Sequence, residues 1–492
     1  MKFDTIIRNG AIANGEGSPL RRADVGILGD LIRAVGDLSS SEAERVIDAA
    51  GLVVAPGFID VHNHAHNEIG GGIMAIPDAD NMLRQGVTTI IAGNCGGSPW
   101  PMDEHLRKVE KLEIRQNYAC LVGLNTVWGQ VMRGTGRSES TETDRGRLTA
   151  LAAQAMQEGA LGVSAGYFPP AIKTADLIAG ARGVAAHGGV YASHIRSEDE
   201  GLLEAVQEII TVGETAGLPV QISHFKTLYP GNWHKRDEAI RLVEEAHARG
   251  VEVLGDRYPY IASYGGIASI APAWARKKEG MAALSADETV RMRKEVDAQL
   301  ERIGGADKVV CAPWATDVEV GGKTLAAVAA AQGRHPGDVV VDLAARGNVS
   351  AIRFGMCEEN LRVFLAHPLV FIGSDGHLRR FGDGTSHPRN YGTFPRVLGK
   401  YVREEKIMSL ETAVKKMTSM PARQFRLHDR GVLRERAIAD LCIFDPDTVA
   451  DRATFDNAHQ YPVGIRHVFV NGGLAVENER TTARGYGRVI RK

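Results

Sequence analysis

The stretch 56-PGFIDVHNH-64 marks the point at which the pattern of the chain changes. Before it, short apolar runs broken by Gly and Asp, such as 4-DTIIRNGAIAN-14, are typical of an antiparallel β-meander. Within it, an apolar run ends in two histidines. After it, short apolar runs alternate with longer amphipathic stretches, which is typical of an α/β unit. The sequence therefore predicts a small β region followed by a larger α/β domain.

Eight short apolar runs follow one another between residue 56 and about residue 399. Runs that are apolar on both faces are typical of strands in a buried parallel sheet, and helix-like segments separate them. One such segment, residues 197–217, has apolar residues at helical spacing and Gly217 as a C-terminal cap. Eight strand and helix units in series predict a (β/α)8 TIM-type barrel. The runs are 57-GFIDVHNH-64, 87-VTTIIAGNC-95, 119-ACLVGLN-125, 160-ALGVSAG-166, 189-GVYASHI-195, 219-PVQISH-224, 251-VEVLGDRY-258 and 369-LVFIGSD-375.

Two regions do not follow the strand and helix repeat. Residues 271–336 contain a helix-like segment and the strand-like run 308-KVVCAP-313, so we expect an insertion within the barrel. After residue 405 the chain returns to short strands, in 439-ADLCIFDPD-447 and 465-IRHVFVNGGLAV-476. We expect residues 1–55 and 406–492 to form a small β-sandwich-like domain, with residues 56–405 as the barrel.

Composition limits the partners of the protein. Its 492 residues include 58 Lys and Arg against 60 Asp and Glu, so no basic excess favours nucleic acid or a membrane surface. The five cysteines are scattered without a CxxC pair, which favours a reducing compartment. No signal-like start and no apolar window of about 18 residues occur, so we expect a cytoplasmic protein. The sequence leaves the oligomeric state open.

Four histidines occupy equivalent places at the ends of predicted strands. His62 and His64 are two residues apart, so both imidazoles point to one face of the strand. His194 and His224 each end a strand and are separated by 30 residues, the length of one strand and helix unit. Because barrel enzymes place their active sites at the carboxyl ends of the strands, these histidines are candidate metal ligands.

Other candidate site residues also follow apolar runs. Asp375, after the eighth run, is a candidate general base beside a metal. Cys95 closes the second run between glycines, and its thiolate would be a strong zinc ligand opposite the histidines. Tyr167 follows the fourth run and could donate a hydrogen bond to an oxyanion, although a core aromatic is an equally good interpretation.

Together these features resemble the D-aminoacylase, or N-acyl-D-amino-acid deacylase, family of the amidohydrolase superfamily. The resemblance implies a zinc-dependent hydrolase that converts the linear amide of an N-acyl-D-amino acid to a D-amino acid and a carboxylate. It spans nearly the whole chain and rests on 93-GNCGGSPWP-101, 193-SHIRSE-198, 222-ISHFK-226, 374-SDGH-377 and 387-HPRNYGTFPRVLGKYV-402.

The resemblance also implies a ligand set. Cys95, His194 and His224 would hold one tightly bound Zn²⁺, while His62 and His64 would line a second, weak or partly occupied position. The fourth strand, 160-ALGVSAG-166, lacks the lysine or glutamate that bridges two metals in many relatives, which favours one functional zinc.

The same resemblance assigns catalytic roles. Asp375, placed beside the metal, would take a proton from the zinc-activated water and deliver it to the departing amine. His62, His64 or Tyr167 would stabilise the oxyanion.

Cationic and phenolic side chains near the strand ends are candidates for binding the α-carboxylate of the substrate. Lys226 and Arg389 would supply cationic donors, and Tyr258 and Tyr260 phenolic hydrogen bonds. Arg196 is expected as a structural partner of Glu198. The loop 265-GGIASIAPAWARKK-278 is mostly apolar, which favours a neutral or hydrophobic D-amino acid over an acidic one.

Two alternative functions use the same residues differently. A cyclic amidase of the dihydroorotase or hydantoinase type shares the HxH motif, but its bridging lysine is missing and Cys95 has no place in its pattern. A metal-binding scaffold without turnover would need neither Asp375 nor the candidate carboxylate-binding cations.

Overall fold

The computed structural model describes residues 2–67, 71–167, 171–276, 284–313, 317, 319–347 and 349–492. Strands and helices alternate along most of these ranges. No helix within them is both long enough and apolar enough to cross a membrane. Lys277 and Lys278, at the end of the apolar loop expected to shape the substrate pocket, lie outside the described residues.

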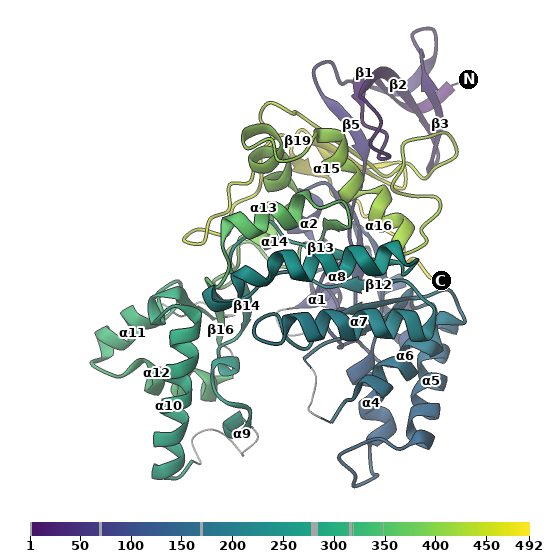
Figure 1. Ribbon diagram of the computed structural model, residues 1–492. Helices are drawn as coiled ribbons and strands as arrows, with labels where there is room; N and C mark the ends of the chain where they lie inside the picture. The colour runs from purple at the N-terminus through teal and green to yellow at the C-terminus, as the bar shows by residue number, and fades with distance from the viewer. Residues whose placement is uncertain are drawn as a thin grey trace.

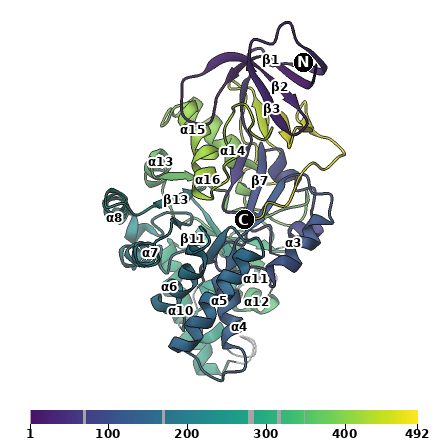
Figure 2. The ribbon, with the colours of Figure 1, turned by 90° about the vertical axis from the view of Figure 1, so that its right-hand side faces the viewer.

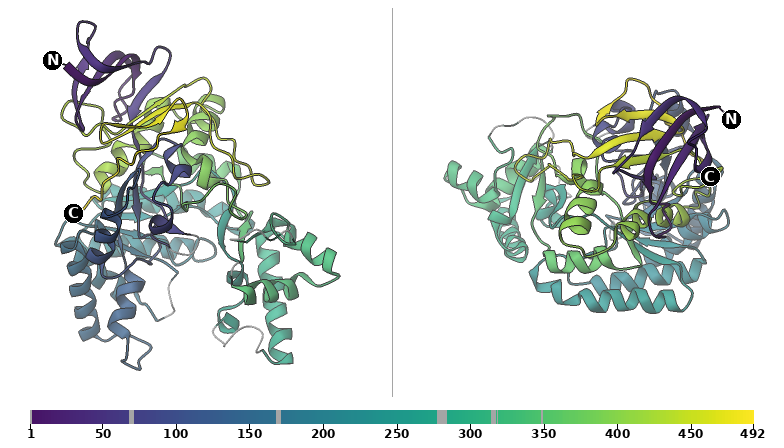
Figure 3. Two further views of the ribbon diagram at one scale, coloured as in Figure 1. Left: turned by 180° about the vertical axis from the view of Figure 1, so that it is seen from behind. Right: turned by 90° about the horizontal axis from the view of Figure 1, so that it is seen from above.

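Both ends of the chain contribute to one mixed sheet. Its strand order is β21-β20-β19-β18-β5-β1-β2-β3, with β4 paired to β1. The two halves join where β18 runs antiparallel to β5, and in Figure 3 the C-terminal strands lie beside the N-terminal ones. The strands are β1 (Lys2–Ile12), β2 (Arg21–Leu28), β3 (Leu31–Gly36), β4 (Glu42–Asp48), β5 (Val53–Pro56), β18 (Leu441–Phe444), β19 (Ile465–Val470), β20 (Gly473–Glu477) and β21 (Arg480–Thr481).

Each of the eight predicted apolar runs contains a parallel strand. One sheet has the order β6-β7-β8 and a second the order β17-β13-β12-β11-β10-β9. β8 and β9 are one strand interrupted at Leu121, whose N–H donates to the Ala92 carbonyl at 2.9 Å. The strands are β6 (Phe58–Asp60), β7 (Val87–Ala92), β8 (Asn117–Cys120), β9 (Val122–Gly123), β10 (Gly162–Ala165), β11 (Val190–Ser193), β12 (Val220–Ile222), β13 (Val253–Arg257) and β17 (Val370–Ile372).

Helices connect the parallel strands, and α5, α6, α7 and α8 pack side by side along them (Figure 2). The segment expected to be helical over 197–217 forms α7 (Leu202–Ala216), which ends where Gly217 adopts a φ of 68°. The other connecting helices are α1 (Gly72–Ala75), α2 (Asp80–Leu83), α3 (Met102–Glu110), α4 (Leu124–Met132), α5 (Glu142–Gln157), α6 (Thr174–Ala185), α8 (Arg236–Ala248), α13 (Glu358–Ala366), α14 (Arg389–Arg396), α15 (Leu410–Met417) and α16 (Ser419–Gln424).

The first and last parallel strands, β6 and β17, meet through a buried carboxylate. Asp60 is fully buried and accepts hydrogen bonds from the Ser374 N–H at 2.9 Å and the Ser374 hydroxyl at 2.5 Å. It also accepts one from the Asn63 amide at 2.9 Å. Next to it, the Asp375 N–H donates to the His62 carbonyl at 2.7 Å. The first and last parallel strands therefore lie next to each other at the residues predicted to carry the chemistry.

An inserted unit lies between β13 and β17 and forms a separate lobe (Figure 1). Its three-stranded antiparallel sheet has the order β14-β16-β15 and a hydrophobic core of its own. β14 and β16 lie outside the expected range of 271–336, and β14, with the sequence Ser-Tyr-Gly-Gly, carries few of the apolar residues typical of strands. The elements are β14 (Ser263–Gly266), α9 (Ala273–Arg276), α10 (Ala286–Ile303), β15 (Val309–Pro313), α11 (Leu325–Gln332), α12 (Pro336–Arg346) and β16 (Val349–Arg353).

Replacing the buried carboxylate between β6 and β17 should destabilise the fold. Asp60→Ala leaves the Ser374 and Asn63 donors buried without their acceptor, so we expect a loss of about 2 to 4 kcal/mol in the free energy of unfolding. Chemical denaturation in the presence of a chelator measures this without a contribution from bound metal. Asp37→Ala, which removes an exposed turn carboxylate bonded to the Ser39 N–H, is the control. Equal stability of the two variants would contradict the role of Asp60.

Candidate metal centre

The candidate site residues follow different parallel strands but meet at one edge of the sheet. His62 and His64 come after β6, Cys95 after β7, His194 after β11, His224 after β12 and Asp375 after β17. Because the carboxyl ends of neighbouring parallel strands face the same side, residues up to 313 positions apart in the sequence lie in contact distance here.

Four of the candidate residues turn the backbone sharply at the strand end. Cys95, Tyr167, His224 and Asp375 have φ angles of 56°, 44°, 41° and 50°, in the left-handed region that non-glycine residues rarely adopt. Such conformations persist only where the surrounding structure imposes them, and they concentrate at functional sites.

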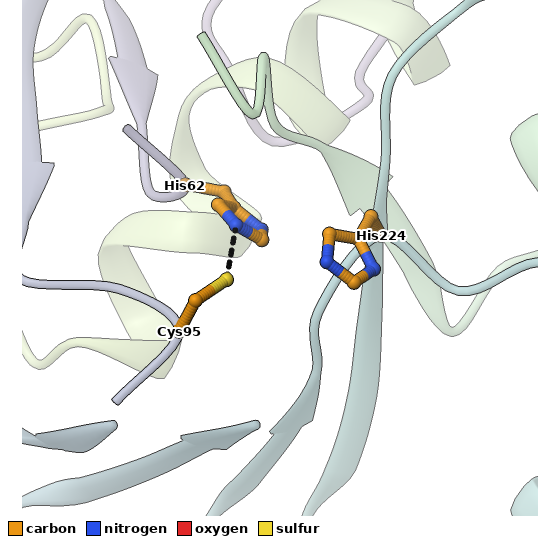
Figure 4. Close-up of side chains that lie close together, drawn as sticks. All are labelled: His62, Cys95 and His224. Carbon is orange, nitrogen blue, oxygen red and sulfur yellow. Dashed lines mark hydrogen bonds between the residues drawn. The ribbon is translucent and has the colours of Figure 1, made fainter. Parts of the chain in front are cut away.

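Cys95, His62 and His224 form a buried cluster of metal-binding atoms (Figure 4). One ligand atom of each lies within 4.8 Å of the other two. The distance between Cys95 Sγ and His62 Nε2 is 3.5 Å. His194 adjoins the cluster, with its Nδ1 2.8 Å from His224 Nε2. The structure therefore places two predicted zinc ligands, Cys95 and His224, in one cluster with His62, and the third, His194, next to His224.

A second cluster shares His62 with the first. It consists of His62, His64 and Asp375, whose ligand atoms again lie within 4.8 Å of one another. His64 Nε2 lies 2.9 Å and His62 Nε2 lies 3.5 Å from Asp375 Oδ1. His62 thus stands between the thiol and the carboxylate, so two metal positions sharing this imidazole are geometrically possible.

The chemistry of the donor atoms fits zinc. Burial raises the pKa of the Cys95 thiol, but the charge of His62 and hydrogen bonds with His194 and His224 outweigh it and bring the pKa well below its ordinary value. Burial lowers the pKa of His62, but Asp256, Asp375 and Cys95 together hold it well above its ordinary value. A thiolate among imidazoles is a donor set that zinc prefers, and zinc would replace the protons held by the cluster.

Two carboxylates contact the ring nitrogens of the histidines. The sequence pattern did not indicate either of them as a site residue. Asp256 lies 3.0 Å from His62 Nδ1, and Glu198 lies 2.6 Å from His224 Nδ1. Carboxylates that receive the second ring N–H orient metal-binding histidines. For Asp256, an available signal was a pair of charged residues, Asp256 and Arg257, at the end of a parallel strand that is otherwise apolar.

The expected pairing of Arg196 with Glu198 is wrong. Arg196 pairs with Glu208 at 2.8 Å, and Glu198 is instead bonded to Lys226 and His224. Glu198 is buried beneath the strand ends, where the opposite charge of Lys226 compensates it. Burial raises the pKa of the Glu198 carboxyl, but Lys226, His224 and His194 outweigh it and hold the pKa well below its ordinary value.

The residues expected to bind the substrate carboxylate occupy different surroundings. Arg389 is buried beside the site and donates to Asp375 Oδ2 at 2.6 Å. Its guanidinium lies 4.8 Å from the ring centre of Tyr258, whose buried hydroxyl has no hydrogen-bond partner among the described residues. Lys226 is also buried and is engaged by Glu198. The Tyr260 hydroxyl donates to Asp451 Oδ2 at 3.3 Å.

Tyr167 and His377 complete the surroundings of the histidines. The Tyr167 ring stacks on His194 with centres 4.6 Å apart, and 65% of the residue is exposed, so Tyr167 is not a core aromatic. His377 stacks on His64 at 4.9 Å. Burial and the neighbouring charges of His64, Arg379 and Arg389 hold the pKa of His377 well below its ordinary value, so its imidazole is neutral.

A cavity of about 270 Å³ opens onto the second cluster. The candidate metal centre contributes His64 and Asp375, and the inserted unit contributes Tyr264 and two glycines of β14 together with Val349 and Ser350 of β16. The inserted unit therefore helps to form the wall of this cavity. The lining residues are His64, Asn67, Tyr167, Tyr264, Gly265, Gly266, Gly347, Val349, Ser350, Asp375, His377 and Arg389.

Comparison with known proteins agrees with this geometry. The family model described as "Amidohydrolase family" matches residues 45–476. The chain belongs to the amidohydrolase family. This amidohydrolase is 36% identical to the D-aminoacylase of Alcaligenes xylosoxydans xylosoxydans, over 99% of this chain and 97% of that protein. The predicted resemblance to the D-aminoacylase family is thereby confirmed.

Solved structures of relatives resemble this amidohydrolase over their full length. The N-acyl-D-glutamate deacylase of Bordetella bronchiseptica, complexed with zinc and a phosphonate mimic of the tetrahedral intermediate, has a TM-score of 0.86 at 33% identity, covering 100% of both chains. A D-aminoacylase structure has a TM-score of 0.84 at 35% identity, again over 100% of both chains. That D-aminoacylase has a binuclear metal centre with one-metal activation and second-metal attenuation.

Removing the thiol of this amidohydrolase should release its metal. Cys95→Ala deletes the one sulfur ligand of the cluster. Loss of a residue that only hydrogen-bonds a metal ligand typically lowers metal affinity by about 10-fold or more, so we expect loss of this direct ligand to lower zinc affinity by more than about 10-fold. Metal analysis after dialysis against buffered zinc measures the effect. Cys357→Ala, at a half-buried thiol outside the clusters found among the described residues, serves as the control. Unchanged zinc content in Cys95→Ala would assign this cysteine a purely structural role.

Proposed function

We propose that this amidohydrolase hydrolyses the amide bond of N-acyl-D-amino acids in a zinc-dependent reaction and releases a D-amino acid and a carboxylate. The observation that carries the proposal is the contact between the Cys95, His62 and His224 cluster and Asp375 beside a cavity of substrate size. Full-length similarity to D-aminoacylase and to a zinc-containing N-acyl-D-glutamate deacylase supports it.

We also infer the architecture behind this site. The eight parallel strands form a (β/α)8 barrel of residues 56–405, and residues 1–55 with 406–492 form the small β-domain that covers one end. Support comes from the order of the parallel strands, from the parallel bridge between Asn63 and Gly376 after the first and last of them, and from the mixed sheet shared by both chain ends. All five cysteines are unpaired, which supports a reducing and hence cytoplasmic location.

Zinc held by the thiolate and imidazoles supplies a Lewis acid, which polarises a carbonyl and lowers the pKa of water from about 15.7 towards 7. We assign the tight position to Cys95, His194 and His224. His62 borders it and, with His64, faces the second, weaker position. His62 Nε2 lies 3.5 Å from Cys95 Sγ and 3.5 Å from Asp375 Oδ1, so this imidazole borders both positions.

Asp375 is the proton carrier of the proposed reaction. Burial raises the pKa of its carboxyl, but Arg389, His62 and the hydrogen bond from His64 outweigh it and hold the pKa well below its ordinary value, so Asp375 is ionised at neutral pH. Its Oδ1 faces the imidazoles and its Oδ2 is held by Arg389. Oδ1 is therefore the oxygen that accepts the proton of the attacking water and returns it to the departing amine nitrogen.

Substrate contacts follow from the cavity lining. The exposed ring of Tyr167 can present its hydroxyl to the oxyanion of the tetrahedral intermediate. Arg389 lines the cavity and is the cation we assign to the α-carboxylate. Its guanidinium lies 4.8 Å from the ring centre of Tyr258, whose hydroxyl has no hydrogen-bond partner in the part of the chain that the structure describes. Lys226 forms an ion pair with Glu198, and its Nζ lies 2.9 Å from His224 Nδ1. We therefore assign its charge to these two residues rather than to the substrate. Tyr260 is not assigned a substrate contact.

Enantiomer selectivity tests the proposed activity. Zinc-loaded protein incubated with paired N-acetyl-D- and N-acetyl-L-amino acids should release free amine from the D-isomers, the configuration named for the full-length relatives D-aminoacylase and N-acyl-D-glutamate deacylase. Fluorogenic amine detection measures release, and chelation followed by zinc return is the control. Absence of D-selective release across a broad panel would overturn the proposal, and turnover of cyclic amides instead would favour the hydantoinase-type alternative.

Asp375→Asn tests the proton carrier separately from metal binding. The amide cannot accept the proton of the attacking water, so we expect turnover to fall by about 100-fold or more. The zinc held at Cys95 should stay, since Asp375 lies outside that cluster. Asp307→Asn, at an exposed position of the inserted unit, is the matched control. Substantial activity in Asp375→Asn would remove this residue from the role of base.

A further inference from the structure

Asp256 is a fully buried carboxylate at the centre of the site, on β13. Three N–H donors from two other strand regions converge on it. His62 Nδ1 lies 3.0 Å from Oδ1 and 3.1 Å from Oδ2, the His224 backbone N–H donates to Oδ1 at 2.9 Å, and the Gln221 amide donates to Oδ2 at 2.6 Å. Each oxygen is therefore occupied by donors from neighbouring strands, and none is left to face the cavity.

The contact with His62 fixes which ring nitrogen faces the metal. A carboxylate oxygen only accepts hydrogen bonds, so the proton of this imidazole is held at Nδ1. The lone pair available to a metal is then on Nε2, which lies 3.5 Å from Cys95 Sγ and 3.5 Å from Asp375 Oδ1. Without Asp256, the ring could rotate or change tautomer and point its proton at the cluster.

The contact with His224 acts through the backbone. His224 has a φ of 41°, a conformation that costs a non-glycine residue of order 1 kcal/mol or more. The hydrogen bond from its N–H to Asp256 Oδ1 holds this turn, and the turn directs the His224 ring towards Cys95 and His194. One side chain thus orients ligands that follow β6 and β12.

We propose that Asp256 is a positioning residue that sets the tautomer of His62 and the backbone turn of His224, and thereby assembles the zinc ligands before the metal binds. The inference rests on the proposed zinc-dependent function. It concerns metal affinity, however, and so can be tested without any substrate. Asp256 itself touches neither substrate nor metal.

Asp256→Asn is the principal test. The Gln221 Oε1 atom has no partner among the described residues, so this amide can rotate and accept from the new asparagine, which preserves packing. We expect the dissociation constant for zinc, measured by chelator competition, to rise by about 10- to 100-fold, as is typical when an outer-shell partner is lost. Asp176→Asn replaces a buried carboxylate of α6 bonded to Ser140 and the Lys173 N–H, and is the matched control. Equal zinc affinity in both variants would overturn the proposal.

A double-mutant cycle separates the two contributions of Asp256, one through the ring of His62 and one through the backbone of His224. If Asp256 acts partly through His62, Asp256→Asn should weaken zinc binding less in a His62→Ala background than in the original protein, and the remaining loss measures the contribution through His224. If the effects of Asp256→Asn and His62→Ala on zinc-binding free energy are fully additive, the contribution of Asp256 through His62 is contradicted. If Asp256→Asn does not fold, Gln221→Met removes the donor that holds Oδ2, and a smaller loss of zinc affinity is expected; no loss would overturn the proposal.

The proposed function and this inference fail in distinguishable ways. Protein that binds zinc tightly but releases no amine from N-acyl-D-amino acids contradicts the proposed function and leaves the role of Asp256 intact. Protein that hydrolyses these substrates, but whose zinc affinity is unchanged by Asp256→Asn, contradicts the inference alone.

Discussion

The site depends on the contact between β6 and β17, the first and last of the parallel strands. Asp60 accepts both donors of Ser374 across this junction, and the Asp375 N–H donates to the His62 carbonyl. These bonds place the two histidines after β6 beside the carboxylate after β17. Without this junction the contact between His64 and Asp375 would be lost, whereas His62 would still adjoin Cys95, because β6 pairs with β7.

Charge balance explains why so many ionisable groups can be buried together. The acidic groups Cys95, Asp375, Asp256 and Glu198 alternate in space with imidazoles, Lys226 and Arg389. Each acidic group contacts at least one cationic or N–H donor, as a buried charge requires. Breaking one member of such a network leaves its partner uncompensated. The network therefore fixes the ligand geometry but makes the site sensitive to single changes.

Much of this arrangement could be predicted from the sequence, because each strand appears as a short apolar run and the site residues stand directly after such runs. The eight apolar runs each contain a strand, and the histidines, Cys95 and Asp375 follow those strands as expected. The extent of the inserted unit could not be predicted in the same way, since β14 has little apolar patterning and its pairing with β16 joins residues as distant in the sequence as Ser263 and Arg353. Lys226 was expected to face the substrate. Its partner Glu198 is 28 positions away, and no local pattern indicates that contact.

The sequence by itself determined which residue types stand at the carboxyl ends of the strands, since apolar periodicity and strand-end histidines are local properties. Only the tertiary structure decided how these groups are paired. His62 serves both clusters, Asp256 joins β13 to two ligands on other strands, and Arg389 holds Asp375 rather than standing free. Hydrogen bonds and charge pairs depend on distances of about 3 Å between residues far apart in the chain, and such distances are set by strand order and packing rather than by spacing in the sequence.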